Sequence, residues 1–258
     1  GLNDVVMNNS PIDIDKLIEG TNEILTANRN SLQLFDMLHS MRQFDDLTYV
    51  HSVNVALIAS ILGQWLKFSE KDIRILTISG LLHDIGKIMI PNEILTKPGK
   101  LTVAEYNIMK QHVNFGYEKV KNQNIDIRIK EACLLHHEKC DGTGYPFGLK
   151  SDHIPAVAKI IAIADVYDAM TSARVYRGAL CPFEVIDTMY KDAFTKFEPE
   201  YILPFLKNVA SSYINNDVRL SDGRIGKVVL INENALSLPI VQCEDEFIDL
   251  SLIHISEP

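Results

Sequence analysis

Histidine and aspartate side chains are concentrated at positions where helices are expected to begin, end or face the interior. Asp84 directly follows one of these histidines, and Asp165 follows the apolar run 161–164. An aspartate on such an apolar face is costly to bury unless it is paired or bound to a metal. Imidazole and carboxylate donors together favour iron, manganese or zinc. Five of the eight histidines belong to this group, namely His51, His83, His112, His136 and His137.

The candidate ligands outnumber those that one four-coordinate ion needs. We therefore predict two metal ions that share a bridging carboxylate, and Asp84 is placed to bridge them. Two ions roughly 3.5–4 Å apart are a known solution for phosphoester hydrolysis, because they lower the pKa of a bound water and hold the phosphate oxygens. For any single histidine taken alone, a role without a metal is the ordinary alternative.

Four further charged residues could assist this chemistry. Lys87 lies about one turn beyond the His–Asp pair and could neutralise phosphate charge, although a lysine at a helix end is also favoured by the macrodipole. Asp168 lies one turn after Asp165 and could orient a ligand or a water. Arg174 and Arg177 could clamp a phosphate, and the alternative for them is a solvated cationic helix end.

The elements that must position these residues are predicted to be helices followed by a short β-rich tail. Gly86 is expected to end one helix as a left-handed residue. Thr102 and Glu105 have the spacing of a capping box. Glycines and prolines predict loops over 90–101 and 138–150, and β-branched runs after Asn216 predict an antiparallel hairpin or meander. Apolar periodicity predicts helices over 12–41, 49–66, 70–85, 102–120, 125–137, 155–170, 182–194 and 198–213.

The composition is typical of a globular protein with a sizeable core. The chain has 258 residues, 47% of them apolar, and a formal net charge of -9. This charge argues against affinity for duplex nucleic acid, which depends on many cationic contacts to phosphate. No apolar run reaches the length of a membrane span, and we find no secretory signal. The scattered cysteines favour a reducing compartment, so we expect a cytoplasmic protein; they are Cys133, Cys140, Cys181 and Cys243.

The ordered series of motifs resembles the HD-GYP family. This is the branch of the HD superfamily of metal-dependent phosphohydrolases that is associated with hydrolysis of the bacterial second messenger cyclic di-GMP. A His–Asp dipeptide alone is a weak signal, whereas the ordered series with a Gly-Tyr-Pro loop is a strong one. The series consists of His51, 83–87 (HDIGK), His112, 136–138 (HHE), 141–146 (DGTGYP) and 164–169 (ADVYDA).

The resemblance implies a role for each matching position. Lys87 would assist catalysis, and Arg174 and Arg177 would hold substrate phosphate. Asp168 would orient a metal-binding side chain without binding the metal itself. Gly144, Tyr145 and Pro146 would shape a loop near the site and offer a surface to protein partners. The metal ligands would be His51, His83, Asp84, His112, His136, His137 and Asp165, with Asp84 bridging.

One departure from the family bears on the number of metals. Some members hold a third metal with a glutamate four residues before the first histidine, and this sequence has Leu47 there. Leucine cannot ligate a metal, so we expect two divalent ions, iron or manganese. Helices before residue 49 could form a homodimer.

The expected fold is an all-α HD-type domain with a small C-terminal β hairpin or meander. We divide the chain into an N-terminal helical segment (1–45), the HD-GYP catalytic domain (46–215) and a β-rich appendage with a disordered end (216–258). The expected activity is hydrolysis of cyclic di-GMP to linear pGpG and, with a second cut, to GMP, by a hydroxide that bridges the two metals. Two alternatives stay open: a catalytically inactive cyclic dinucleotide receptor or partner-binding module, and a hydrolase of a different cyclic dinucleotide.

Overall fold

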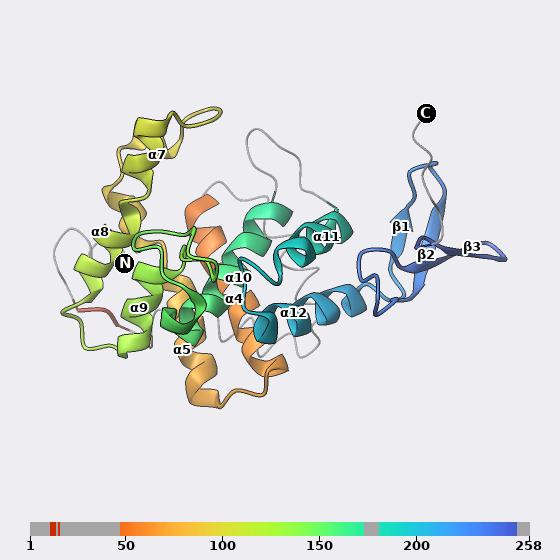
Figure 1. Ribbon diagram of the computed structural model, residues 1–258, viewed down its shortest axis with the longest axis horizontal. Coiled ribbons are helices and arrows are strands. Elements are labelled where there is room, and N and C mark those ends of the chain that lie inside the picture. Colours follow the sequence, from red (N-terminus) through yellow and green to blue (C-terminus); the bar gives the residue numbers. More distant parts are fainter. Residues whose placement is uncertain (1–10, 14, 16–46, 173–180, 252–258) are drawn as a thin grey trace.

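A computed structural model describes residues 11–13, 15, 47–172 and 181–251. In Figure 1 a helical body lies at one end of the molecule and a small sheet at the other, with α12 leading from one to the other. The helix expected over 12–41 and the disordered end fall almost entirely outside the described residues. The described helices are α4 (Leu47–Trp65), α5 (Glu70–Leu82), η1 (Ile85–Met89), α6 (Asn92–Leu95), α7 (Val103–Met109), α8 (His112–Val120), α9 (Ile127–Leu135), η2 (Ser151–His153), α10 (Ala156–Thr171), α11 (Pro182–Asp192) and α12 (Pro199–Ser212).

Helices α4 and α10 form the centre of the helical body. Residues 55–59 of α4 are completely buried, and α10 is buried on most of its length through residues 157–168. A helix that is apolar on nearly all sides is stable only in the interior, where neighbouring helices cover it. Helix α4 accordingly contacts α5, α10 and α12. Polar side chains on the buried faces of these two helices are therefore held in a water-poor environment.

The helix expected over 102–120 begins as predicted but is divided in two. Thr102 and Glu105 form the capping box at the start of α7. Helix α7 ends at Met109 and α8 begins at His112, without a glycine or proline between them. The His112 ring nitrogen Nδ1 lies 2.8 Å from the Met109 carbonyl oxygen, so a side chain bonds a carbonyl of the last turn of α7. This bond depends on the position of His112 in the site, which the sequence pattern does not show.

Gly86 does not end α5 as a left-handed residue, so that prediction is wrong. Helix α5 ends at Leu82, and Gly86 lies within the short helix η1. A Cβ atom on Gly86 would lie 2.0 Å from the His112 carbonyl oxygen and 2.4 Å from the Gly116 amide nitrogen. The glycine is thus explained by the close approach of η1 to α8. Another difference is the short helix α6, which lies in the segment expected to be a loop.

The C-terminal strands form an antiparallel meander in the order β1-β2-β3-β4. The strands are β1 (Asp217–Arg219), β2 (Ile225–Leu230), β3 (Ile240–Cys243) and β4 (Glu246–Asp249). The expected fold class, a helical domain with a small β meander, is confirmed. Val228 of β2 joins the main apolar core together with Ile231 and Leu236. Within the described ranges, no helix has the length and apolar character needed to cross a membrane.

Candidate metal centre

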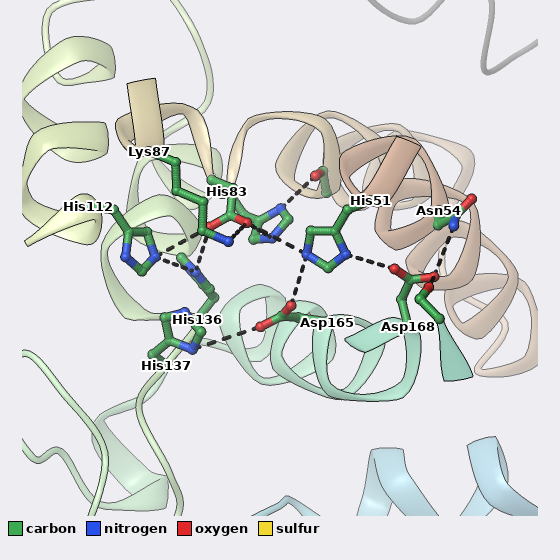
Figure 2. A network of polar contacts seen from close by, with 12 residues as sticks. His51, Asn54, His83, Lys87, His112, His136, His137, Asp165 and Asp168 are labelled. Carbon is green, nitrogen blue, oxygen red and sulfur yellow. Dashed lines mark hydrogen bonds and ion pairs between the residues drawn. The ribbon is translucent and has the colours of Figure 1, made fainter. Parts of the chain in front are cut away.

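The structure brings all seven predicted metal ligands into one cluster. Figure 2 shows His112, His136 and His137 on one side of this cluster and His51 on the other, with Asp165 reaching in from below. The ligands come from five parts of the fold: His51 from α4, His83 and Asp84 from the end of α5, His112 from the start of α8, His136 and His137 from the end of α9, and Asp165 from α10.

The two carboxylate oxygens of Asp84 face different histidines. Oδ2 lies 3.2 Å from His83 Nε2 and 3.6 Å from His51 Nε2. Oδ1 lies 3.3 Å from His112 Nε2 and 3.8 Å from His136 Nε2. A carboxylate that presents one oxygen to each of two donor groups has the geometry of a bridging ligand.

Asp165 spans the same two groups from the opposite side. Its Oδ1 lies 3.1 Å from His51 Nε2, and its Oδ2 lies 3.8 Å from His137 Nδ1. The donors therefore divide into a pair (His51, His83) and a trio (His112, His136, His137), and both carboxylates link the pair to the trio. The two carboxylates therefore connect the five imidazoles into one cluster that could hold metal ions.

Hydrogen bonds to backbone carbonyl groups outside the cluster fix the orientation of three imidazole rings. A carbonyl oxygen only accepts, so the ring nitrogen facing it carries the proton and the other nitrogen keeps its lone pair. In each of the three rings this leaves the unprotonated Nε2, with its lone pair, directed at the cluster. The bonds run from His83 Nδ1 to Gly80 O (2.7 Å), from His112 Nδ1 to Met109 O (2.8 Å) and from His136 Nδ1 to Ala132 O (3.0 Å).

Asp168 orients His51 in the corresponding way, as Figure 2 shows. Asp168 Oδ2 lies 2.7 Å from His51 Nδ1, while Oδ1 accepts hydrogen bonds from Asn54 Nδ2 at 2.9 Å and from Ser172 Oγ at 3.2 Å. Sequence reasoning missed Asn54. The signal that could have found it is a polar amide one turn after His51 in an otherwise apolar helix.

The protonation states around the cluster suit metal binding. Burial lowers the pKa of His112, lowers that of His137 to about 4, and lowers that of His136 well below its ordinary value. Burial alone would raise the pKa of Asp84, but the interactions of this carboxylate with the His83 ring and with the Lys87 ammonium group outweigh burial and hold that pKa well below the usual range. Neutral imidazoles and ionised carboxylates are the forms that bind divalent metals.

His51 differs from the other rings because both of its nitrogens face carboxylates. Burial lowers its pKa, yet the hydrogen bonds with Asp165 and Asp168 raise it to about 9. A cation at this position would replace the proton between His51 and Asp165.

Two buried atoms of the cluster test whether it fits a metal. His83 Nε2 and Asp84 Oδ1 are buried and have no hydrogen-bond partner among the described residues. Buried polar atoms nearly always have a partner, so such atoms need an explanation. A divalent ion would supply the missing partner, since both atoms offer a lone pair and point into a cluster of imidazole and carboxylate groups. The residues present therefore fit a metal centre.

A family model described as HD domain matches residues 18–201. The chain belongs to the HD domain family. A cyclic di-GMP phosphodiesterase of Pseudomonas aeruginosa is 36% identical over 203 residues, covering 78% of this chain and 49% of that protein. A 3'3'-cGAMP-specific phosphodiesterase of Vibrio cholerae is 36% identical over 173 residues, covering 66% of this chain and 38% of that protein. The chain thus spans about half or less of the length of these relatives.

Among solved structures, an HDG"Y"P protein from Bdellovibrio bacteriovorus has the same fold. Its TM-score is 0.60 at 22% identity, covering 74% of this chain and 60% of that one. The resemblance of the sequence to the HD-GYP branch of the HD superfamily is confirmed.

The Gly-Tyr-Pro loop of this HD domain lies directly on His137, one of the predicted ligands. The Tyr145 amide donates to the His137 carbonyl oxygen at 3.2 Å, and the Tyr145 ring stacks on the His137 ring with centroids 4.7 Å apart. Gly144 allows this contact, because a Cβ atom there would lie 2.4 Å from the Lys139 amide nitrogen. Pro146 follows Tyr145 through a cis peptide bond. The loop therefore forms one wall of the metal cluster.

Glu138 holds the far side of this loop. Its buried carboxylate accepts three backbone N–H bonds, from Phe147 at 2.7 Å, Gly148 at 3.1 Å and Leu149 at 2.9 Å. The sequence places Glu138 in the motif beside His137 but gives no sign of this anchoring contact.

Not all predicted site residues can be placed. Arg174 and Arg177 lie outside the described residues. Leu47 is the first residue of α4. In the part of the chain that the structure describes, every group of His, Cys, Asp and Glu that could hold a metal contains members of the cluster described above.

Proposed function

We propose that this chain is a metal-dependent phosphodiesterase that hydrolyses cyclic di-GMP to linear pGpG and, with a second cut, to GMP. The observation that carries the chemistry is Asp84, whose two oxygens face two separate histidine groups within one buried cluster. The similarity to a cyclic di-GMP phosphodiesterase over most of this chain supports the substrate.

The proposed cofactor is a pair of divalent ions, iron or manganese. His51 and His83 would hold one ion and the trio His112, His136 and His137 the other, with Asp84 and Asp165 shared between them. When bound, two such ions lower the pKa of a water and neutralise charge on the phosphate. Leu47, in place of a possible glutamate ligand, supports two ions rather than three.

The exposure of the cluster indicates the side from which substrate approaches. The side chains of His83 and His136 are completely buried, whereas those of His137 and Lys87 are 26% and 24% exposed. Lys87 forms an ion pair with Asp84 Oδ2 on this open side. We propose that its ammonium group neutralises a phosphate oxygen of the substrate. Arg174 and Arg177 remain proposed phosphate ligands.

A second candidate substrate is 3'3'-cGAMP, because a relative specific for it is as similar in identity as the cyclic di-GMP relative. Both substrates present the same phosphodiester to the cluster and differ in one base. The alternative hypothesis of a catalytically inactive receptor is disfavoured, since all seven expected ligand positions carry a residue able to bind metal.

The decisive experiment combines metal analysis with a substrate panel. The protein is loaded with manganese or iron under reducing, oxygen-free conditions and assayed with cyclic di-GMP and 3'3'-cGAMP. We expect two metal ions per chain and linearisation of cyclic di-GMP. Asp84→Ala should lose metal and lower activity by more than the roughly 10–100-fold that loss of an outer hydrogen-bond partner costs.

The matched control is Asp187→Ala, which removes an exposed carboxylate of α11 that pairs with Lys191 on the surface. It should leave metal content and activity unchanged. Equal activity in Asp84→Ala and the parent protein would rule out the proposed site, and turnover of 3'3'-cGAMP alone would replace the proposed substrate.

The remaining expectations stay predictions. The four cysteines are free, which agrees with the proposal that the protein works in the reducing cytoplasm. Binding of protein partners through the Gly-Tyr-Pro loop is untested. The proposed homodimer rests on helices before residue 49, most of which lie outside the described residues. The division at residues 45/46 and 215/216 is also a proposal.

A further inference from the structure

We infer that Tyr106 of α7 and Lys110, the residue that follows α7, form together with Tyr145 a subsite that stacks and recognises a guanine base beside the histidine–aspartate cluster. The identity of the full substrate rests on the proposed function. The subsite itself rests on the contacts of these three residues, and neither Tyr106 nor Lys110 belongs to the motifs that indicated the metal centre.

A continuous series of rings leads from the metal cluster to α7. The Tyr145 ring stacks on His137 with centroids 4.7 Å apart and lies 6.5 Å from the His112 ring. The Tyr106 ring meets Tyr145 edge to face at 6.5 Å. Aromatic surface is therefore present beside two proposed metal ligands and extends outward from them.

Tyr106 is not a core residue of the protein. Helix α7 has no buried residue at all, and Tyr106 is 48% exposed. A tyrosine that packs on one aromatic neighbour and remains half exposed offers part of its flat ring to a ligand. Nucleobases stack on such rings because every base has a π face.

Lys110 adds a positive charge over this aromatic surface. Its Nζ lies 5.3 Å from the Tyr106 ring centroid and 5.9 Å from that of Tyr145. Tyr106 and Lys110 are four residues apart, so they lie on one face of the helical turn. Among the described residues, the ammonium group of Lys110 lies against these two tyrosine rings rather than against a carboxylate.

The charge selects the kind of base. Guanine presents two acceptors, N7 and O6, on one edge, whereas adenine places the N6 amino donor where guanine has O6. An ammonium group carries only donors. A guanine stacked on Tyr106 can therefore direct its acceptor edge at Lys110, while adenine would oppose one donor with another.

The test measures binding of small ligands and needs no turnover. GMP, AMP and ribose 5-phosphate are titrated into the manganese-loaded protein by calorimetry, because all three carry the phosphate but only GMP carries guanine. We expect GMP to bind about tenfold more tightly than ribose 5-phosphate, which is the size of one base–aromatic stack. GMP should also bind more tightly than AMP.

Variants assign the two effects to the two residues. Tyr106→Ala should abolish the advantage of GMP over ribose 5-phosphate, and Tyr106→Phe should restore it because the ring returns. Lys110→Met should remove the preference for GMP over AMP while keeping the stack. The control is Tyr190→Ala, which removes an equally exposed tyrosine (42%) that also meets a ring edge to face, Phe194, on the distant helix α11. A merely structural role would change the affinity for ribose 5-phosphate as well.

Two results would overturn the proposed subsite. One is equal affinity of the parent protein for GMP and ribose 5-phosphate, and the other is tighter binding of GMP than of ribose 5-phosphate that survives in Tyr106→Ala. Both are independent of the proposed function. If the protein shows the GMP advantage but does not linearise cyclic di-GMP, the subsite stands and the proposed activity fails. If cyclic di-GMP is linearised without any GMP advantage, the activity stands and the subsite fails.

Discussion

At the scale of single residues, the cluster depends on how each ligand is held as much as on which ligand is present. Asp84 lies immediately after His83, beyond the end of α5, so its side chain is free of the helix and can point between two histidine groups. His51 depends on a residue 117 positions away, because Asp168 bonds its outer ring nitrogen. Such supporting partners set ring orientation and the basicity of the ligand.

Replacing Asp168 by asparagine tests this dependence. The neutral amide holds His51 less strongly, so we expect Asp168→Asn to weaken metal binding by roughly 10–100-fold. In the metal-free protein it should lower the His51 pKa from about 9, because one of the carboxylates that raise this pKa is lost. Metal affinity is measured by competition with a chelating dye, and the pKa by NMR titration of the ring.

The control for this prediction is Ser172→Ala. It removes a hydroxyl that donates to Asp168 Oδ1 at 3.2 Å and leaves the His51–Asp168 contact intact. Metal affinity close to that of the parent protein is expected. The same loss of affinity in both variants would mean that Asp168 acts only through the packing of α10.

At the scale of elements, close backbone contacts determine where the ligands lie. Helix η1 carries Lys87 and packs on α8, whose first residue is His112. Gly86 and Gly116 face each other across this contact. The distance between Asp84 and His112 is therefore set by two elements that touch through glycines.

Exchanging each glycine for alanine distinguishes the two sides of this contact. A Cβ atom on Gly86 would lie 2.0 Å from the His112 carbonyl oxygen, a backbone atom that cannot move away alone. We expect Gly86→Ala to lower the free energy of unfolding by about 2–3 kcal/mol through overpacking, and to displace His112. Urea unfolding and metal analysis measure the two effects.

Gly116→Ala is the matched substitution on the facing helix. Its Cβ atom would lie 3.4 Å from the nearest atom, the Gly86 amide nitrogen, which is an ordinary contact distance. Alanine is favoured over glycine inside a helix by up to about 1 kcal/mol, so unfolding should be unchanged or slightly harder. A similar loss of stability in both variants would contradict the role given to Gly86.

At the scale of the whole molecule, the small sheet is joined to the helical body through a shared core. Val228, Ile231 and Leu236 belong to the same apolar cluster as α4, α10 and α12. The backbone also connects the two parts, since the Asn215 amide donates to the Val228 carbonyl oxygen at 2.7 Å. We therefore expect the sheet and the helices to unfold together.

Val228→Ala measures this coupling. Removing buried methyl groups from a completely buried valine should cost about 2 kcal/mol. The single tryptophan, Trp65, lies in α4 and packs near Phe205, so its fluorescence reports on the helical body. We expect Val228→Ala to shift the denaturation midpoint seen by Trp65, although the substitution lies in the sheet.

Ile225→Ala is the control from the same strand. Ile225 is 61% exposed, and its truncation should change stability by no more than about 0.5 kcal/mol. If Trp65 fluorescence gives the same denaturation midpoint for Val228→Ala and for the parent protein, the sheet is an independent unit. The shared core then contributes nothing to the stability of the helical body.

The sequence by itself determined the chemistry of this protein. The ability of histidine and aspartate to bind metal belongs to the side chains, and their order along the chain indicated the family. Local signals were equally readable: the capping box at Thr102 and Glu105 involves neighbours in sequence, and the β-branched runs after Asn216 predicted the meander. Each of these features is complete within a short segment or a fixed motif order.

Only the tertiary structure decided the geometry of the site. The direction of the two Asp84 oxygens, the contact of Asn54 with Asp168 and the approach of η1 to α8 depend on helices that are distant in sequence. Gly86 was misread for this reason, because a glycine required by a neighbouring backbone has the same sequence appearance as one that ends a helix. Tyr106 gained its proposed role only when folding placed it beside Tyr145 and His137. Residue type limits what a side chain can do, and packing of the helices fixes what it meets.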